Sequence, residues 1–139
     1  MRTSMKNKQK LRYALYRGRE AIPVTDDDNE IVYGDDGEPR KSGSYRGSYG
    51  RPTEFFANIA FAGGEAEAVA YGVSVDAYDS KIVLMRDELP LTETSLIFQN
   101  SKPKYRKDGS LDEKSADFRV IRKAPSLNYT VYLLKRIEK

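Results

Sequence analysis

The chain has 139 residues, of which 39% are hydrophobic and 32% charged, and its formal net charge is +3. This length fits one domain with a single core, and the modest apolar content predicts that part of the chain lies in loops or interfaces. Cys and His are both absent, which excludes disulfides, thiolate metal sites and His-dependent catalysis. We therefore expect neither an enzyme nor a bound cofactor. No long apolar run predicts a membrane span, and no signal peptide is visible.

The charges are unevenly distributed along the chain. Residues 1–20 carry seven Lys or Arg and one acid, and residues 101–139 carry eleven and five. The middle, residues 21–100, carries six bases and fifteen acids. If these parts lie on different surfaces, copies of the chain attract one another head to tail. The simpler alternative is that the charges only solvate loops and tails.

Residues 1–10 are polar and basic without apolar periodicity, so they predict a flexible arm before a single domain at residues 11–139. LRYALY (residues 11–16) alternates like a strand. AIPV and EIVYG flank the acidic TDDDNE, which predicts a hairpin around residues 26–29. Three adjacent Asp also suggest calcium, but the spaced ligands of an EF-hand loop are missing, so a solvated turn is favoured.

Two long loops are predicted, at residues 34–52 and 100–117, from their Gly, Ser, Lys and Arg content. The first contains SYRGSYGR, whose Tyr and Arg could stack on bases and contact phosphates. A segment that orders against a neighbouring subunit is the interpretation we favour. The residues expected to contact a neighbour or partner in these two loops are Arg40, Lys41, Tyr45, Arg46, Tyr49, Lys104, Tyr105 and Arg106.

The remaining apolar segments predict a mainly β fold, a small barrel or sandwich with at most one short helix. Besides residues 11–16, strands are expected near residues 53–61, 80–85, 94–98, 117–123 and 129–137. The predicted core comprises Leu15, Phe55, Ile59, Phe61, Ile82, Leu84, Ile97, Val120, Val131 and Leu133.

GEAEAVAYG (residues 64–72) has divided preferences. Its Ala and Glu favour about two helical turns. Glu65 and Glu67 are two apart, however, which places them on opposite sides of a helix but on one side of a strand. Such a segment suits a place whose shape is set by partners. Asp76 and Asp79 follow, and a polar turn is favoured there over a metal site, because two carboxylates alone are a weak ligand set.

The segments ALYRG, EFFANIAFAGGEAEAVAYGVSVDAYDSKIVL, PLTETSLIF and FRVIRKAPSLNYTVYLLKRI resemble small head–tail connector proteins of tailed bacteriophages, in particular the head-closure or stopper type. The resemblance spans roughly residues 11–137 and lies in the order of elements and in local phrases. It implies a small β-barrel assembled as a ring between the portal-bound adaptor and the tail terminator or tail-tube protein. Double-stranded phage DNA would pass through the ring, within the neck of a virion made in a bacterial cytoplasm. The two long loops depart from the family's pattern.

The resemblance also implies that the segment 62–75 holds the gate or faces the lumen. The gate candidates are Gly63, Gly64, Glu65, Glu67 and Tyr71. Small residues permit close approach at a ring axis, and repeated carboxylates repel DNA. An ordinary surface turn is the alternative for this segment. For the whole chain, the alternatives are another neck protein (an adaptor or tail terminator) and an OB-like single-strand nucleic-acid-binding protein using Tyr45, Tyr49, Tyr105, Tyr129 and Tyr132.

Overall fold

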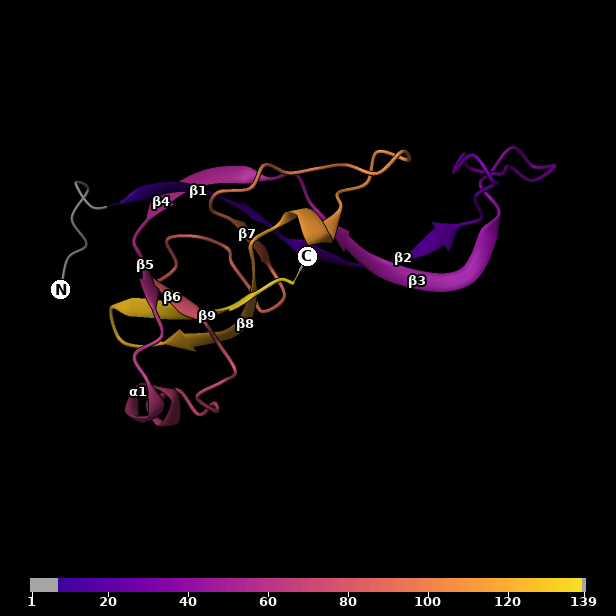
Figure 1. The fold of residues 1–139 in the computed structure, drawn as a ribbon. Coiled ribbons are helices and arrows are strands. Elements are labelled where there is room, and N and C mark those ends of the chain that lie inside the picture. Colours follow the sequence, from indigo (N-terminus) through magenta and orange to yellow (C-terminus); the bar gives the residue numbers. More distant parts are fainter. Residues whose placement is uncertain (1–7, 139) are drawn as a thin grey trace.

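A computed structural model describes residues 8–138 of the chain (Figure 1). The fold is mainly β, as predicted, with one short α-helix in the described part. The elements are β1 (Gln9–Ala14), β2 (Tyr16–Pro23), β3 (Lys41–Tyr49), β4 (Thr53–Ala57), β5 (Ile59–Phe61), α1 (Glu65–Ala70), β6 (Ser80–Met85), β7 (Leu96–Phe98), the 3₁₀ turn Glu113–Ser115, β8 (Phe118–Pro125) and β9 (Tyr129–Arg136).

Seven strands form one antiparallel sheet in the order β4-β1-β7-β8-β9-β6-β5. The two edge strands, β4 and β5, are consecutive in the chain and separated only by Asn58. They are the two halves of one bent strand, whose first half pairs with β1 and whose second half pairs with β6. The sheet therefore curls into a nearly closed barrel, which leaves few free edges for unwanted pairing.

The barrel interior is filled by alternate residues of its strands, as the strand period of two requires. The largest wholly enclosed side chains there include Tyr132, Phe118 and Leu134. Of the residues predicted for the core, the structure buries Phe55, Ile82, Leu84, Ile97 and Val120 in this interior, with Leu15 and Ile59 partly buried against them. These predictions of buried residues are confirmed.

Two smaller apolar clusters lie on the outside of the barrel. One contains Leu96, Phe98 and Leu111, and the segment 99–117 covers it. The other contains Leu133, Ala68 and Tyr78, and the segment 62–79 covers it. Leu133 is thus buried as predicted, with Val131 packed beside it, but on the outer face of β9, because the neighbouring Tyr132 and Leu134 take the inner face.

Strands β2 and β3 form a separate two-stranded ribbon, here called the arm together with the loops at its far end (residues 16–49). Figure 1 shows the arm projecting from the barrel and curving along its length. Register shifts between Tyr16 and Gly18 and between Ala21 and Pro23 mark bulges, which bend a ribbon and increase its twist. The far end of the arm, residues 24–40, folds back through the isolated bridges Thr25–Ile31 and Tyr33–Pro39.

Several predictions of the strands and core need correction. The loop predicted at residues 34–52 is wrong over its second half, because Lys41–Tyr49 forms β3, and β2 was missed. Phe61 is 86% exposed at the end of β5 rather than in the core. The turn near residues 26–29 is present, since the Asn29 amide donates to the Asp26 carbonyl. The predicted N-terminal arm lies outside the described residues up to residue 7, and its last two residues belong to β1.

Candidate functional site

The segment between β5 and β6 begins with two glycines that bring the chain close to Glu67. Gly64 has φ of 96°, in the left-handed region that glycine adopts without strain, and α1 starts immediately after it. An added Cβ at Gly63 would collide with the carboxylate of Glu67. A side chain at Gly63 would therefore displace the Glu67 carboxylate, and the turn into α1 itself depends on positive φ at Gly64.

Glu67 is the centre of a polar cluster under this turn. Its Oε1 accepts hydrogen bonds from the Gly63 amide at 2.9 Å and from the Tyr78 hydroxyl at 2.6 Å. Its Oε2 forms an ion pair with the ammonium group of Lys81 on β6. Only 19% of the Glu67 side chain is exposed. The segment 62–79, which leaves the barrel after β5 and returns to it at β6, is called the excursion. The Glu67 carboxylate thus connects the start of the excursion (Gly63), its end (Tyr78) and the barrel strand β6 (Lys81).

The gate candidates consequently separate into two groups. Glu65 is exposed and free to face solvent or a channel, whereas Glu67 turns inward. The sequence-based role for Glu67, as a free carboxylate repelling DNA, is therefore not compatible with its position in this fold. Tyr71 is half-buried and packs on the outer apolar cluster of Ala68, Tyr78 and Leu133. The helix separates the two carboxylates because successive residues turn by about 100°.

Two carboxyl groups, those of Glu67 and Asp108, have strongly lowered pKa values, which predicts that the folded state is less stable in acid. Burial raises the pKa of Glu67, but hydrogen bonds from Lys81, Tyr78 and Gly63 outweigh it and lower the pKa to about 2. Burial is likewise outweighed at Asp108, where bonds from Ser110 and Arg46 lower the pKa to about 2. Because both folded pKa values lie below the ordinary ones, their stabilisation is complete above about pH 4.5 and is lost as pH falls towards 2.

We therefore expect the free energy of unfolding, measured by urea titration at fixed ionic strength, to be level from pH 7 to 5 and to fall steeply below pH 4. In each of the variants Glu67→Gln and Asp108→Asn, the free energy of unfolding should decrease less between pH 4 and pH 2 than in the wild type. A wild-type curve that stays level down to pH 2.5 would contradict the ion pairs described.

The second polar cluster joins the arm to the segment 99–117. Arg46 on β3 donates from Nε to Glu20 on β2 at 2.8 Å. Its terminal nitrogen binds Asp108 and also donates to the Ser110 hydroxyl at 3.0 Å. The Arg46 side chain is only 14% exposed, and burial opposes its charge, yet the two carboxylates raise its pKa. One guanidinium therefore holds β2, β3 and the tip of a distant loop together.

The predicted contact residues are distributed between this cluster and the open surface. Arg46 and Arg106 make internal bonds, since Arg106 donates to the Leu111 carbonyl at 2.7 Å. Tyr49 is half-buried and packs edge-on against Tyr16 at the base of the arm. The candidates left exposed are Arg40, Lys41, Tyr45, Lys104 and Tyr105. The structure thus places the segments 34–52 and 100–117 side by side. Three of the eight candidates, Arg46, Tyr49 and Arg106, make contacts within the chain.

Asp117, which the sequence did not single out, anchors the base of the segment 99–117. Its Oδ2 accepts three successive backbone amides, from Gln99, Asn100 and Ser101, at 2.7–3.0 Å. Burial raises the pKa of Asp117, but these bonds and one from the Ser101 hydroxyl lower it overall. The loop therefore starts and ends at one carboxylate, which fixes the direction in which its tip reaches Arg46.

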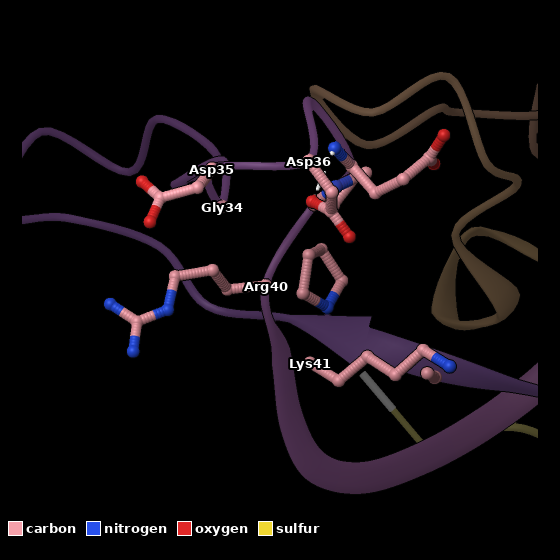
Figure 2. A pocket seen from close by; sticks show the side chains of 9 residues that line it. Gly34, Asp35, Asp36, Arg40 and Lys41 are labelled. Carbon is pink, nitrogen blue, oxygen red and sulfur yellow. Dashed lines mark hydrogen bonds between the residues drawn. The ribbon is translucent and has the colours of Figure 1, made fainter.

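A hollow lies at the far end of the arm, lined by residues 34–36 and 38–41 together with Ala21 and Pro23 (Figure 2). Figure 2 shows the side chains of Asp35, Asp36, Arg40 and Lys41 spread around the hollow without converging on one point. Within residues 8–138, no group of three acidic side chains is placed to hold a metal ion. The hollow is therefore a gap in a folded loop without the features of a ligand site.

The acidic positions considered for metals have local partners. Asp26 Oδ1 accepts the amides of Asp28 and Glu30, both at 2.9 Å, as in a turn stabilised by its own Asp. Asp79 Oδ2 accepts the Arg136 amide at 2.7 Å. The neighbouring Asp76 carbonyl receives a bond from Lys135 at 3.1 Å. These contacts agree with the favoured interpretation of both positions as turns.

Comparisons with protein families, with curated proteins and with solved structures found no match for this chain. In the described residues, no helix has the length and apolarity needed to cross a bilayer.

Proposed function

We propose that this chain is a structural component of a tailed-phage neck, a head-closure or stopper ring that joins the portal-bound adaptor to the tail, retains packaged DNA and gates its exit. The observation that carries the proposal is the combination of a small barrel with a projecting arm and with a helical excursion between β5 and β6. The resemblance implies the small barrel and a gate-forming element after β5, whereas the arm contains a segment that departs from the family's pattern. The chain would work within the virion, without catalysis, after synthesis in the bacterial cytoplasm.

The arm supports an assembly role. An isolated two-stranded ribbon is marginally stable in water, and this one leaves Tyr33 and Tyr45 about 60% exposed. The middle of its ribbon is nevertheless fixed by the bonds of Arg46, so the arm is held out from the barrel in a defined direction. A rigid, exposed projection of this kind suits a contact with another subunit, and repeated heterologous contacts close into a ring.

The excursion that contains α1 supports the gating role. Glu65 is exposed on α1, and the small residues around it allow equivalent segments to come close at a ring axis. Repeated carboxylates there would repel the DNA backbone, whereas a basic lining would bind it. In this arrangement Glu67 does not face DNA. It holds the excursion on the barrel, and the gate opens when contacts of this segment are exchanged.

The test is imaging of necks assembled with and without this chain. The proposal requires several symmetric copies between the adaptor and the tail terminator or tail-tube protein. A single copy, or none, would refute it. Salt-dependent binding of the isolated protein to single-stranded DNA, with no neck density, would instead favour the OB-like alternative.

Glu65→Lys provides a finer test of the gate. Because the exposed Glu65 side chain forms no hydrogen bond or ion pair within residues 8–138, folding should be unaffected, while one positive charge per copy replaces a negative one at the proposed channel. We expect assembled particles with slowed or incomplete DNA release, measured by fluorescence of ejected DNA. The matched control is Glu88→Lys, on the exposed turn after β6. Equal DNA release by both variants would show that Glu65 does not face the lumen.

A further inference from the structure

A hollow with three lysines in its lining lies at the base of the segment 99–117, and we call it the lysine hollow. Its volume is about 320 Å³. The residues that line it are Ser101, Lys102, Lys104, Asp112, Lys114 and Ser115. The three lysines are all exposed. Figure 1 shows the segment 99–117 and α1 on opposite sides of the barrel, so the lysine hollow lies away from the proposed gate.

The cations of this segment differ in whether the chain supplies an acid for them. At the tip, a terminal nitrogen of Arg106 lies 3.8 Å from the Asp112 carboxylate. The Lys107 ammonium group lies 3.2 Å from the carboxylate of Glu30 on the arm. In contrast, the three lysines of the hollow form no ion pair in the described part of the chain. Asp112 is the acid in the lining, and its Oδ1 already accepts the Lys114 amide at 3.1 Å. The lysine hollow therefore carries positive charge that the chain does not neutralise.

The backbone that carries these lysines is held on both sides of the hollow. The Asp117 carboxylate accepts the amides of residues 99–101, immediately before the first lysine. The Ser115 hydroxyl accepts the Lys104 amide at 3.1 Å and donates to the Asp112 carbonyl at 2.6 Å. The Asp112 amide in turn donates to the Lys104 carbonyl at 2.8 Å. Because the backbone is already ordered, a ligand that binds several of these lysines has a smaller entropy cost to overcome.

The spacing of the lysines suits a chain of anions. Lys102 precedes Pro103, and a residue before proline favours extended backbone. Lys104 and the two residues after it are paired with residues 110–112 and are extended as well. Two residues of extended chain span about 6.6 Å, which is comparable with the step between successive phosphates of a nucleic-acid strand. Lys114 lines the same hollow from the other side. An ammonium group binds phosphate as a point charge, so no fixed orientation of the ligand is required.

We propose that the lysine hollow binds backbone phosphates of a nucleic acid through the ammonium groups of Lys102, Lys104 and Lys114. Such contacts do not read the base sequence, so a duplex and a single strand both fit. Lysines that neutralise phosphates release condensed counterions, which makes the binding strong at low salt and weak at high salt. The site goes beyond the proposed function and does not depend on it. Its position opposite α1 leaves the proposed gate acidic.

The first experiment measures the binding of a short, fluorescein-labelled DNA duplex of mixed sequence by anisotropy at several salt concentrations. The test variant removes the three lysines of the hollow by Lys102→Ala, Lys104→Ala and Lys114→Ala. The control variant removes three cations at exposed positions elsewhere by Arg40→Ala, Lys41→Ala and Arg86→Ala. Both variants lose the same charge, and both change only exposed side chains without ion pairs in residues 8–138, so folding is unaffected.

We expect the test variant to bind the duplex at low salt with an affinity that is lower by roughly tenfold or more. The slope of log affinity against log salt should decrease by about 2–3, near 0.9 for each of three phosphate contacts. The control variant should stay close to the wild type in both quantities. Equal losses in the two variants, or no loss in the test variant, would overturn the proposal.

Further measurements identify what the hollow binds. Single-stranded DNA of the same length should lose affinity for the test variant to a similar extent. Tyr105→Ala, at an exposed position on the same segment, should leave both affinities unchanged. A loss from Tyr105→Ala as large as that in the test variant would indicate base stacking and contradict the proposal.

Polyglutamate is the competitor that represents an acidic protein surface. At equal total charge it should displace the duplex only at a much higher concentration, because its charge density is lower. Displacement at equal concentration would assign the hollow to an acidic protein and reject the nucleic acid. A symmetric neck ring without this DNA binding would reject the site alone, whereas the DNA binding in a protein absent from necks would reject the proposed function alone.

Discussion

Replacing Glu67 with Gln is expected to lower the free energy of unfolding by about 2–3 kcal/mol, because a mostly enclosed carboxylate with three partners is lost. Gln still accepts one hydrogen bond, but Lys81 keeps its charge without a counter-ion. Lys81 and Tyr78 lie on different segments, so the loss also weakens the attachment of the whole excursion. Chemical denaturation measures the first effect, and amide exchange in residues 62–79 measures the second.

Glu65→Gln is the matched control for this experiment. It changes the same residue type on the same helix, two positions away, at an exposed site. Its effect on unfolding should stay within about 0.5 kcal/mol, as is usual at exposed positions. If the two variants are equally stable, the cluster around Glu67 does not hold the excursion.

Arg46→Ala is expected to destabilise the protein by about 2–3 kcal/mol and to release the arm. The change leaves Glu20 and Asp108 unpaired in partly enclosed positions and removes the bond to Ser110. Arg46→Lys should recover little, because an ammonium group lacks the planar fork with which a guanidinium binds two carboxylates at once. Limited proteolysis and amide exchange of residues 16–23 and 41–49 measure the release.

The control for Arg46 is Arg40→Ala, on the same arm but exposed. In this variant, the amide exchange of residues 16–23 and 41–49 should equal that of the wild type. A double-mutant cycle with Asp108→Ala then isolates the contact between the arm and the loop, and we expect a coupling of about 1 kcal/mol or more. Additive effects would mean that Arg46 acts through β2 alone. Under the proposed neck role, Arg46→Ala should also lower incorporation into assembled necks, since the arm then loses its fixed direction.

The barrel strands were predictable because each has one face in the core. The segment 80–85 was predicted with the bounds that the structure has, since Ile82 and Leu84 alternate with outward residues. β2 and β3 were missed because the arm has no buried face, and its Gly and Ser produce no alternation. Phe61 was wrongly assigned to the core. The alternation of the strand predicts which face its side chain takes, but it does not show that β5 ends at Phe61, where the side chain is exposed.

The candidate site was predictable in part. The sequence identified the unusual segment after β5 and the contact loops, and it gave the opposite directions of Glu65 and Glu67 on a helix. It could not provide the partners of Glu67 and Arg46, because Lys81 and Asp108 are 14 and 62 residues away and meet them only through the sheet. Asn58 lay within a predicted continuous strand, and only the pairing of β4 and β5 with different neighbours reveals the bend.

The place of β9 in the sheet determines the order of events during synthesis. β9 lies between β8 and β6, so the inner edge of β6 stays unpaired until residues 129–136 have left the ribosome. At elongation rates of roughly 5–20 residues per second this interval lasts roughly 3–10 seconds. Meanwhile Ile82 and Leu84 lie on a bare strand, the kind of edge that recruits other chains. Overproduction at lower temperature or with a chaperone that binds extended apolar segments should therefore increase the soluble yield.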